Sequence, residues 1–419
     1  MQKLAIKGGR KLSGTIMISG SKNATLPILA STILTNKKVT ITNVPIVKDV
    51  ETMVNLLKSI GSKIKLDKKE KIVEVLNNNI VKTFAPYNLL KTMRAGVLVL
   101  GSLLGKYRVA KVSLPGGCAW GPRPIDYHLT AFETLGAKVT LRSGYIVTKG
   151  NLKAHVIKFP QPSVGATGNI IMAACQAEGI SEIFNAACEP EVINLANMLR
   201  SMGALIEGDG TKTIRINGVS NLNGADHTII PDRIEAGTFM IAGAITGGEI
   251  ELIGCQPCHL STVINTMRQA GVIVEETERD SCVIRAPHEI QACNIITKEY
   301  PGFATDMQAQ FMALMTQAHG TSFITETIFE SRFLHASEMI RMGANIKIEG
   351  NQATIFGKTN LTGANVIASD LRASASLVLA GLVATGETII DRVYHLDRGY
   401  ERIEHKLKTL GAKIIRGSK

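Results

Sequence analysis

The sequence predicts an α/β protein of two similar domains, each built from three repeats with buried helices inside and sheets outside. Three observations predict it: the length, a recurring helix–glycine–strand phrase, and a second set of helices that are apolar on nearly every face. The chain has 419 residues. Domains with a single hydrophobic core are usually shorter than this chain, so two domains of about 200 residues are expected.

The helix–glycine–strand phrase occurs six times, as LLKSIGSKIKL, FETLGAKVTL, NMLRSMGALIE, NTMRQAGVIVE, EMIRMGANIKI and KLKTLGAKII. The intervals between copies are 67 to 75 residues. Glycine closes a helix readily because it adopts left-handed backbone angles, and the alternation that follows predicts a strand. The six glycines are Gly61, Gly136, Gly203, Gly271, Gly343 and Gly411.

A second phrase recurs at the same spacing, with a polar start and a helix of small and apolar residues. Its copies begin SKNATLPILA, TMRAGVLVLG, SVGATGNIIMAA, DRIEAGTFMIAG, TDMQAQFMALM and DLRASASLVLAG. Helices apolar all round are buried, so three repeats should enclose them with sheets. The first such helix begins near Ser21, after one or two strands. We therefore expect residues 1–21 to join residues 231–419 in one domain, and residues 22–230 to form the other.

Polar residues gather at the first turns of these buried helices. Free N–H groups and the helix dipole favour anions there, and added cations make an anion site. If the two domains point these helix starts at each other, a multiply charged anion should bind between them. The alternative is that the Asp and Ser residues are simply N-caps. The residues are Lys22, Asn23, Arg94, Ser163, Gly165, Asp232, Arg233, Asp306, Asp370 and Arg372.

Composition narrows the functional classes. The net charge is +12, which fits either an anionic partner or a lysine-rich surface without binding meaning. The chain has one Trp and few other aromatic residues, which argues against nucleic-acid binding by stacking of bases on aromatic side chains. It contains no run of 18 apolar residues, so no membrane span is expected. The N-terminus lacks the apolar segment of a signal peptide. Seven scattered cysteines read as mostly reduced thiols, so a cytoplasmic protein is expected.

The segment SLPGGCAWGPRPID predicts a long loop, because its prolines and glycines preclude regular structure. It carries Cys118 five residues before Arg123, a setting that can lower a thiol pKa and raise reactivity. Flanking glycines would let this loop move as an active-site lid. The alternative is an incidental loop cysteine.

The other cysteines point to no site. Cys175 falls in a buried helix, and Cys188, Cys282 and Cys293 have no suggestive neighbours. The run CQPCH at residues 255–259 matches a haem-attachment pattern, which requires export, and it has too few ligands to close a zinc site. No nucleotide-binding glycine loop of the usual spacings occurs. We expect neither a metal nor a cofactor.

Ten motifs in order give a resemblance from about residue 4 to residue 417: SGSKNA, TMRAG, PGGCAWGPRPID, SVGAT, EPEV, PDRIEAGTF, TDMQAQ, TETIFESRF, DLRASASLVLAG and YHLDRGYERIE. Together they resemble the UDP-N-acetylglucosamine 1-carboxyvinyltransferases of the enolpyruvyl transferase family. The resemblance implies two inside-out α/β barrels of three repeats each. It also implies transfer of enolpyruvyl from phosphoenolpyruvate to UDP-N-acetylglucosamine, the first committed step of peptidoglycan synthesis.

The resemblance also implies roles for individual residues. Cys118 matches the residue that protonates C3 of the enolpyruvyl group and forms a covalent adduct, and Asp306 matches the carboxylate that contacts the sugar 3-hydroxyl and serves as the base. Lys22 and Arg398 complete the expected catalytic set. The residues implied to bind substrate are Lys22, Asn23, Arg94, Arg123, Pro124, Ile125, Asp126, Tyr127, Ser163, Val164, Gly165, Asp306, Ile328, Arg332, Asp370, Arg372 and Arg398.

Two departures from the family pattern leave the reacting groups intact: Trp120 replaces a smaller aliphatic residue and Tyr127 replaces a leucine. The retained Cys118 predicts alkylation by the epoxide fosfomycin. We expect a monomer or weak oligomer that binds neither nucleic acid nor membrane. Two rival functions stay open: transfer to shikimate 3-phosphate, and non-catalytic binding of nucleic acid by a basic protein.

Overall fold

A computed structural model describes residues 2–78, 82–91, 93–114, 125–277, 280–329 and 332–418. The chain divides into two compact units. The mid-chain unit runs from Gly20 to Ile230, and the terminal unit contains the residues up to Ser19 together with those from Pro231 onward. Each unit has its own continuous hydrophobic core.

The mid-chain unit contains three repeats. The first comprises α1 (Lys22–Ser31), η1 (Thr32–Leu34), β3 (Val39–Thr42), α2 (Lys48–Ile60), β4 (Lys63–Asp67), β5 (Ile72–Leu76) and the distant β14 (Asp226–Thr228). The second comprises β6 (Phe84–Ala85), α3 (Tyr87–Leu90), η2 (Arg94–Leu98), α4 (Val99–Tyr107), β7 (Val109–Ser113), α5 (Asp126–Thr134), β8 (Lys138–Arg142) and β9 (Tyr145–Lys149). The third comprises β10 (Val156–Lys158), α6 (Val164–Ala174), β11 (Ile180–Phe184), α7 (Pro190–Ser201), β12 (Leu205–Glu207) and β13 (Thr213–Asn217).

The terminal unit repeats the same plan. Its first repeat comprises β2 (Ser13–Met17), α8 (Arg233–Ile245), β15 (Glu249–Ile253), η3 (Pro257–Leu260), α9 (Ser261–Gln269), β16 (Ile273–Thr277) and β17 (Ser281–Arg285). Its second comprises β18 (Ile295–Ile296), η4 (Thr305–Met307), α10 (Gln308–Met315), β19 (Gly320–Thr325), α11 (Leu334–Arg341), β20 (Ile346–Glu349) and β21 (Gln352–Gly357). Its third comprises β22 (Asn365–Ile367), α12 (Leu371–Val383), β23 (Glu387–Asp391), η5 (Val393–Arg398), α13 (Ile403–Thr409), β24 (Lys413–Ser418) and β1 (Gln2–Lys7).

The sheets of the described residues share one topology. Each has four strands, ordered β14-β3-β5-β4, β6-β7-β9-β8, β10-β11-β13-β12, β16-β17-β15-β2, β18-β19-β21-β20 and β22-β23-β1-β24. Each sheet has one parallel pair, and its other pairs are antiparallel. In the pairs β6/β7, β10/β11, β18/β19 and β22/β23, an inner helix of the repeat supplies the crossover that a parallel pair needs. The parallel pairs β14/β3 and β2/β15 instead join strands that are distant in the chain.

Strands from outside their own stretch of chain complete three sheets. β1 lies between β23 and β24, with Leu4 opposite both Ile390 and Arg416. β2 runs parallel to β15, and β14 runs parallel to β3. The N-terminal strands therefore belong to sheets of the terminal unit, while β14 closes a sheet of the mid-chain unit.

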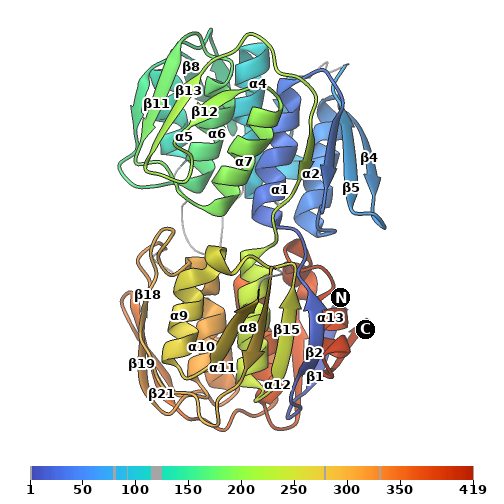
Figure 1. Cartoon of the computed structure of the whole chain (residues 1–419), viewed down its shortest axis with the longest axis vertical. Helices are drawn as coiled ribbons and strands as arrows, with labels where there is room; N and C mark the ends of the chain where they lie inside the picture. The colour runs from blue at the N-terminus through green and yellow to red at the C-terminus, as the bar shows by residue number, and fades with distance from the viewer. Residues whose placement is uncertain are drawn as a thin grey trace. The chain divides into compact units, whose positions relative to one another are not determined.

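Helices occupy the interior of each unit and sheets its outside (Figure 1). In the mid-chain unit α1, α4 and α6 pack together, and in the terminal unit α8, α10 and α12 do so. Every residue of α10 is buried, which explains why these helices are apolar all round. Close approach needs small residues, since a Cβ on Gly101 would lie 2.2 Å from the carbonyl oxygen of Asn169.

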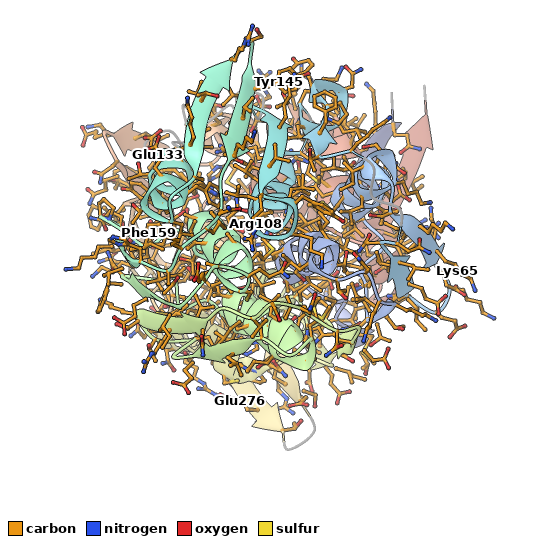
Figure 2. All side chains as sticks on the ribbon, turned by 90° about the horizontal axis from the view of Figure 1, so that it is seen from above. Lys65, Arg108, Glu133, Tyr145, Phe159 and Glu276 are labelled. Carbon is orange, nitrogen blue, oxygen red and sulfur yellow. The ribbon has the colours of Figure 1, made fainter. Side chains whose placement is uncertain are left out.

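Side chains follow this layering within the mid-chain unit (Figure 2). Lys65 on β4 is exposed on the outside, and Tyr145 on β9 lies on another outer sheet. Arg108, which follows α4, lies among the helices, where its Nη2 donates to the carbonyl oxygen of Gln176 at 2.8 Å.

Candidate active site

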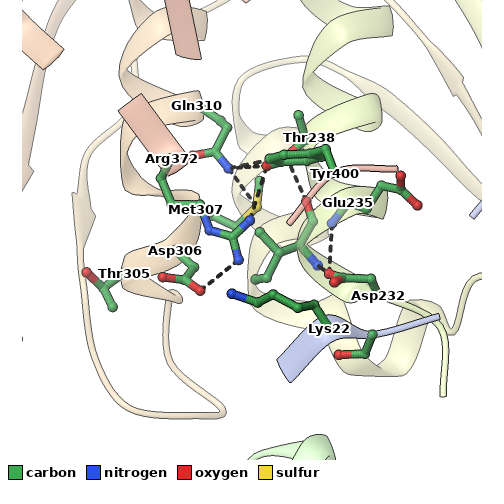
Figure 3. Close-up of polar contacts among 12 residues, drawn as sticks. Lys22, Asp232, Glu235, Thr238, Thr305, Asp306, Met307, Gln310, Arg372 and Tyr400 are labelled. Carbon is green, nitrogen blue, oxygen red and sulfur yellow. Dashed lines mark hydrogen bonds and ion pairs between the residues drawn. The ribbon is translucent and has the colours of Figure 1, made fainter. Parts of the chain in front are cut away.

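The terminal unit holds a carboxylate between two arginines. Asp306 lies in η4 before α10, Arg332 lies just before α11, and Arg372 lies in the first turn of α12. Arg332 Nη2 is 2.7 Å from Asp306 Oδ1, and Arg372 Nη2 is 2.9 Å from Oδ2 (Figure 3 draws the latter). The arginine side chains are 4% and 5% exposed, whereas that of Asp306 is 28% exposed. The pairing leaves an accessible edge on the carboxylate.

Electrostatics keeps this trio ionised. Burial opposes the charge on Asp306, but the guanidinium groups of Arg372 and Arg332 outweigh it and hold the pKa of this carboxyl well below its usual value. Burial likewise opposes the charge on Arg372, and Asp306 more than compensates, so the pKa of Arg372 is raised. Two cations against one anion leave a net positive charge within the trio. Such a centre suits an anionic ligand.

Tyr400 fixes the other side of Arg372. The Arg372 Nη1 group donates to the Tyr400 hydroxyl at 3.3 Å, and the same hydroxyl lies 2.8 Å from Thr238 Oγ1 and 3.3 Å from Gln310 Nε2 (Figure 3). Burial raises the pKa of Tyr400, so its hydroxyl stays neutral. The sequence reasoning did not select Tyr400, although the residue lies within the quoted motif YHLDRGYERIE.

Glu326 organises the surroundings of Arg332. Arg332 Nη1 donates to Thr305 Oγ1 at 2.7 Å, and that hydroxyl donates to Glu326 Oε2 at 2.8 Å. The other Glu326 oxygen accepts from the backbone N–H of Ile328 at 2.8 Å. One buried carboxylate thereby links the arginine to the loop of Ile328, which was predicted to contact the sugar nucleotide. Glu326 was also missed, although it lies in the motif TETIFESRF.

Three of the predicted first-turn residues cap helices. Asp370 accepts from the backbone N–H groups of Arg372 and Ala373 at 2.8 and 3.0 Å. Asp232 caps α8 in the same way, and Ser163 caps α6 by accepting from Ala166 at 3.3 Å. The capping alternative therefore holds for these side chains. Their predicted contacts with substrate stay predictions, and capping by Asp370 places Arg372 at the helix start.

Arg398 is the last residue of η5 and acts electrostatically on the neighbouring His395. Burial lowers the pKa of His395, the charge of Arg398 lowers it further, and Asp370 opposes both. Arg398 and Asp370 thus influence the same imidazole. The 3-10 turn η5, which ends at Arg398, packs against α12, the helix that carries Arg372.

In the mid-chain unit, Lys22 begins α1 directly after the N-cap Ser21. Its ammonium nitrogen lies 3.6 Å from Asp49 Oδ2, and both side chains are largely buried. A cation at a helix N-terminus opposes the helix dipole, and Asp49 from the first turn of α2 compensates for it. Asn23 is the second residue of the same helix. The predicted pair therefore lies at one helix start.

Arg94 opens η2 and lies near a buried imidazole. Burial, with a further contribution from the charge of Arg94, lowers the pKa of His128 to about 4, so the imidazole is neutral. Asn169 Nδ2 lies 2.8 Å from His128 Nδ1 and also donates to the Val97 carbonyl at 3.1 Å. These bonds join α5 and α6 to the turn that carries Arg94.

The remaining predicted residues of this unit fall on two helix starts. The carbonyl of Ile125 accepts from the N–H of His128 at 2.9 Å, and Asp126 and Tyr127 begin α5. Gly165 lies in the first turn of α6, where a Cβ would come within 3.3 Å of the His128 ring. Val164 is exposed beside it. Cys118, Trp120, Arg123 and Pro124 lie outside the described residues.

The part of the chain that the structure describes shows neither a metal-binding cluster of side chains nor a membrane-spanning helix. Its His, Cys, Asp and Glu side chains form no group of three or more that could hold a metal ion. Of the helices among these residues, none has the length and apolarity needed to span a membrane. The functional groups described are therefore cations, carboxylates and helix starts.

Comparison with known proteins places these features in a family. The family model described as EPSP synthase (3-phosphoshikimate 1-carboxyvinyltransferase) matches residues 6–407. The chain is 53% identical over 418 residues to a UDP-N-acetylglucosamine 1-carboxyvinyltransferase from Solibacter usitatus (strain Ellin6076), covering 99% of this chain and 100% of that protein. It is 52% identical over 419 residues to the protein of that name from Pelagibacter ubique (strain HTCC1062), covering 99% and 100%.

Solved structures share the fold. The enolpyruvyl transferase NikO from Streptomyces tendae matches with a TM-score of 0.91 and 23% identity, covering 100% of this chain and 99% of that one. An EPSP synthase from Acinetobacter baumannii matches with a TM-score of 0.77 and 17% identity, covering 100% of both chains. The predicted fold class, with its two three-repeat α/β domains, is confirmed.

Proposed function

The chain belongs to the EPSP synthase (3-phosphoshikimate 1-carboxyvinyltransferase) family, and we propose that its own acceptor is UDP-N-acetylglucosamine. It transfers the enolpyruvyl group of phosphoenolpyruvate to the 3-hydroxyl of this sugar nucleotide and releases phosphate. Relatives about half identical over the whole length bear the name of this activity, which supports the choice of acceptor. The reaction is the first committed step of peptidoglycan synthesis.

The observation that carries this function is the Asp306 carboxylate between Arg332 and Arg372. Phosphoenolpyruvate has a phosphate and a carboxylate, so it needs cations that are already desolvated and oriented. The two buried arginines meet this need. They also hold a carboxylate beside the position where the donor would bind.

Asp306 is the proposed base, and its present contacts make it a weak one. A base works best with a pKa near the operating pH, whereas the two arginines hold the pKa of Asp306 well below its usual value. An incoming anionic donor competes with Asp306 for the same guanidinium groups. Donor binding would thus raise the proton affinity of the carboxylate. Asp306 then accepts the proton of the sugar 3-hydroxyl as that oxygen attacks C2.

Cys118 is the proposed acid, on the strength of its loop and the family resemblance. Its thiol gives a proton to C3 while C2 is attacked, producing a tetrahedral ketal. The C2–O bond to phosphate then breaks, C3 gives a proton back to the Cys118 thiolate so that the C2–C3 double bond forms again, and phosphate leaves. Lys22, Arg94 and Arg398 are proposed to hold the donor's anionic groups and to stabilise the charge that develops during these steps.

The sugar nucleotide is proposed to use the helix starts of the mid-chain unit. Arg123 to Tyr127 would contact the uridine, and the turn of Ser163, Val164 and Gly165 would bind the diphosphate. A helix N-terminus with free N–H groups suits such an anion. Ile328 and Asp306 of the terminal unit are proposed to contact the sugar.

Phosphate release provides the test. The purified chain should release phosphate from phosphoenolpyruvate when UDP-N-acetylglucosamine is added and not in its absence. Shikimate 3-phosphate is the second candidate acceptor, because the description of the matching family model names 3-phosphoshikimate. Release with shikimate 3-phosphate alone would refute the proposed acceptor while leaving the enolpyruvyl transfer intact.

A further inference from the structure

Two buried thiols meet where β15 ends. Cys255 Sγ lies 3.5 Å from Cys282 Sγ, and both residues are 0% exposed. Cys255 comes two residues after β15, Cys282 is the second residue of β17, and these strands are antiparallel neighbours. The sequence placed Cys255 with Cys258 only in a haem-attachment pattern that was rejected, and it gave no suggestive neighbour for Cys282. That expectation was wrong for Cys282, because the pairing of distant strands decides the contact.

The backbone around the two thiols is well fixed. The Cys255 N–H donates to the Asp280 carbonyl at 2.9 Å, and Cys282 pairs with Leu252 in the sheet. A disulfide needs a sulfur separation of about 2 Å, so a change of about 1.5 Å joins the two atoms. Side-chain rotation supplies movements of this size. Cys258, by contrast, is exposed on η3.

We propose that Cys255 and Cys282 form a reversible disulfide when the protein meets a hydroperoxide. The Cys255 thiolate attacks one peroxide oxygen, the O–O bond breaks, and a sulfenic acid forms at Cys255. The Cys282 sulfur then attacks the sulfenic sulfur, forming the S–S bond and releasing water. In total two thiols lose two electrons and two protons, and hydrogen peroxide becomes two waters. Local opening of the turn after β15 admits the peroxide.

The directions of the two pKa shifts favour Cys255 as the sulfur that attacks. The hydrogen bond between the two thiols lowers the pKa of Cys255 despite its burial and raises the pKa of Cys282. Burial raises the pKa of Cys175 to about 12 and that of Cys293 to about 11, so neither supplies much thiolate.

The test treats the full chain with increasing hydrogen peroxide, blocks free thiols with iodoacetamide, and digests without reduction. Trypsin places Cys282 in residues 280–285 and Cys255 with Cys258 in residues 234–268. We expect these peptides to become linked, at a mass two hydrogens below the sum of the peptide 280–285 and the peptide 234–268 carrying one carbamidomethyl group, and dithiothreitol to separate them. The linkage should persist in Cys258→Ser and disappear in Cys255→Ser.

Three results would overturn the proposal. One is a linkage that survives Cys255→Ser, which would identify Cys258 as the partner. Another is oxidation of Cys255 and Cys282 to separate sulfinic acids without linkage, since dithiothreitol does not reverse that product. The third is quantitative alkylation of both thiols by iodoacetamide after peroxide treatment in the wild-type chain. The wild-type experiment tests the linkage without any variant having to fold, and fragmentation of the linked peptide shows whether Cys255 or Cys258 carries the carbamidomethyl group.

Discussion

Arg372 donates from Nη2 to Oδ2 of Asp306 at 2.9 Å, while its Nη1 reaches the Tyr400 hydroxyl at 3.3 Å. One guanidinium therefore joins the proposed base to a buried neutral hydroxyl. The cap formed by Asp370 fixes the helix turn from which Arg372 extends. The Arg372 guanidinium is therefore positioned by Asp306 in η4, by the Tyr400 hydroxyl and by the start of α12 that Asp370 caps.

Tyr400→Phe should lower kcat/KM for phosphoenolpyruvate about tenfold, because a hydrogen bond to a charged group typically contributes about 1.5–3 kcal/mol and this one is long. The ion pair with Asp306 remains in this variant. Steady-state phosphate release at varied donor concentration measures the effect. Tyr394→Phe is the matched control, since Tyr394 is 51% exposed and should behave as wild type. An unchanged kcat/KM in Tyr400→Phe would show that the hydroxyl does not position Arg372.

Asp306→Asn should reduce turnover at least about 100-fold, the usual contribution of a general base. Binding of phosphoenolpyruvate should be equal or tighter, because the two arginines no longer pair with a carboxylate. Calorimetric titration and single-turnover kinetics separate these effects. Asp397→Asn is the control, since that carboxylate pairs with Arg416 at 2.7 Å outside the site. Near-normal turnover in Asp306→Asn would remove Asp306 as the base.

His128→Gln should make stability less sensitive to mild acid. Burial lowers the pKa of His128 to about 4, so the unfolded chain takes up the proton at a higher pH than the folded one. The stability contributed by the neutral imidazole is therefore complete above the unfolded value of about 6.5 and is lost as pH falls toward 4. Between about pH 7 and about pH 5 the loss is about 2 kcal/mol.

Urea unfolding at these two pH values measures that prediction. The wild-type chain should lose more stability than His128→Gln over the interval. His288→Gln is the control, because His288 is exposed and should leave the wild-type loss unchanged. His335 is also buried with its pKa lowered to about 4, so the single variant removes only part of the dependence. Equal losses in all three proteins would contradict the assignment.

Cys118→Ser should abolish overall turnover, since a serine hydroxyl is a far weaker acid than a thiol. Cys118→Asp should retain much of the activity and resist fosfomycin, because a carboxyl can give a proton but lacks the thiol that the epoxide alkylates. Phosphate release with and without fosfomycin measures both variants. Cys258→Ser, which removes an exposed thiol elsewhere, should stay active and sensitive. Normal turnover of Cys118→Ser would show that Cys118 is not the acid that protonates C3.

Much of the fold could be predicted because it rests on local signals. All six glycines of the helix–glycine–strand phrase have φ between 87° and 116°, as a helix-closing residue requires. Asp370 and Ser163 lie at helix starts, as the repeat alignment predicted. Arg94 and Asp306 instead lie in 3-10 turns that precede the inner helices, a distinction of hydrogen bonding that the pattern does not carry.

The contacts within the site could not be predicted, because they join distant stretches of chain. Nothing local to Tyr400 indicates that it meets Arg372, and nothing near Glu326 indicates that it links Thr305 to the loop of Ile328. The low pKa of Asp306 likewise depends on Arg332, which lies before α11, and on Arg372 in α12. The sequence motifs therefore indicate which residues belong to the site, whereas their contacts depend on how the repeats pack together.

One competition experiment tests the central claim most directly. The chain is given phosphoenolpyruvate together with equal amounts of UDP-N-acetylglucosamine and shikimate 3-phosphate, and the products are identified by mass spectrometry. We predict that only the sugar nucleotide gains the enolpyruvyl group, in step with phosphate release. Enolpyruvyl-shikimate 3-phosphate as the sole product would contradict the proposed acceptor.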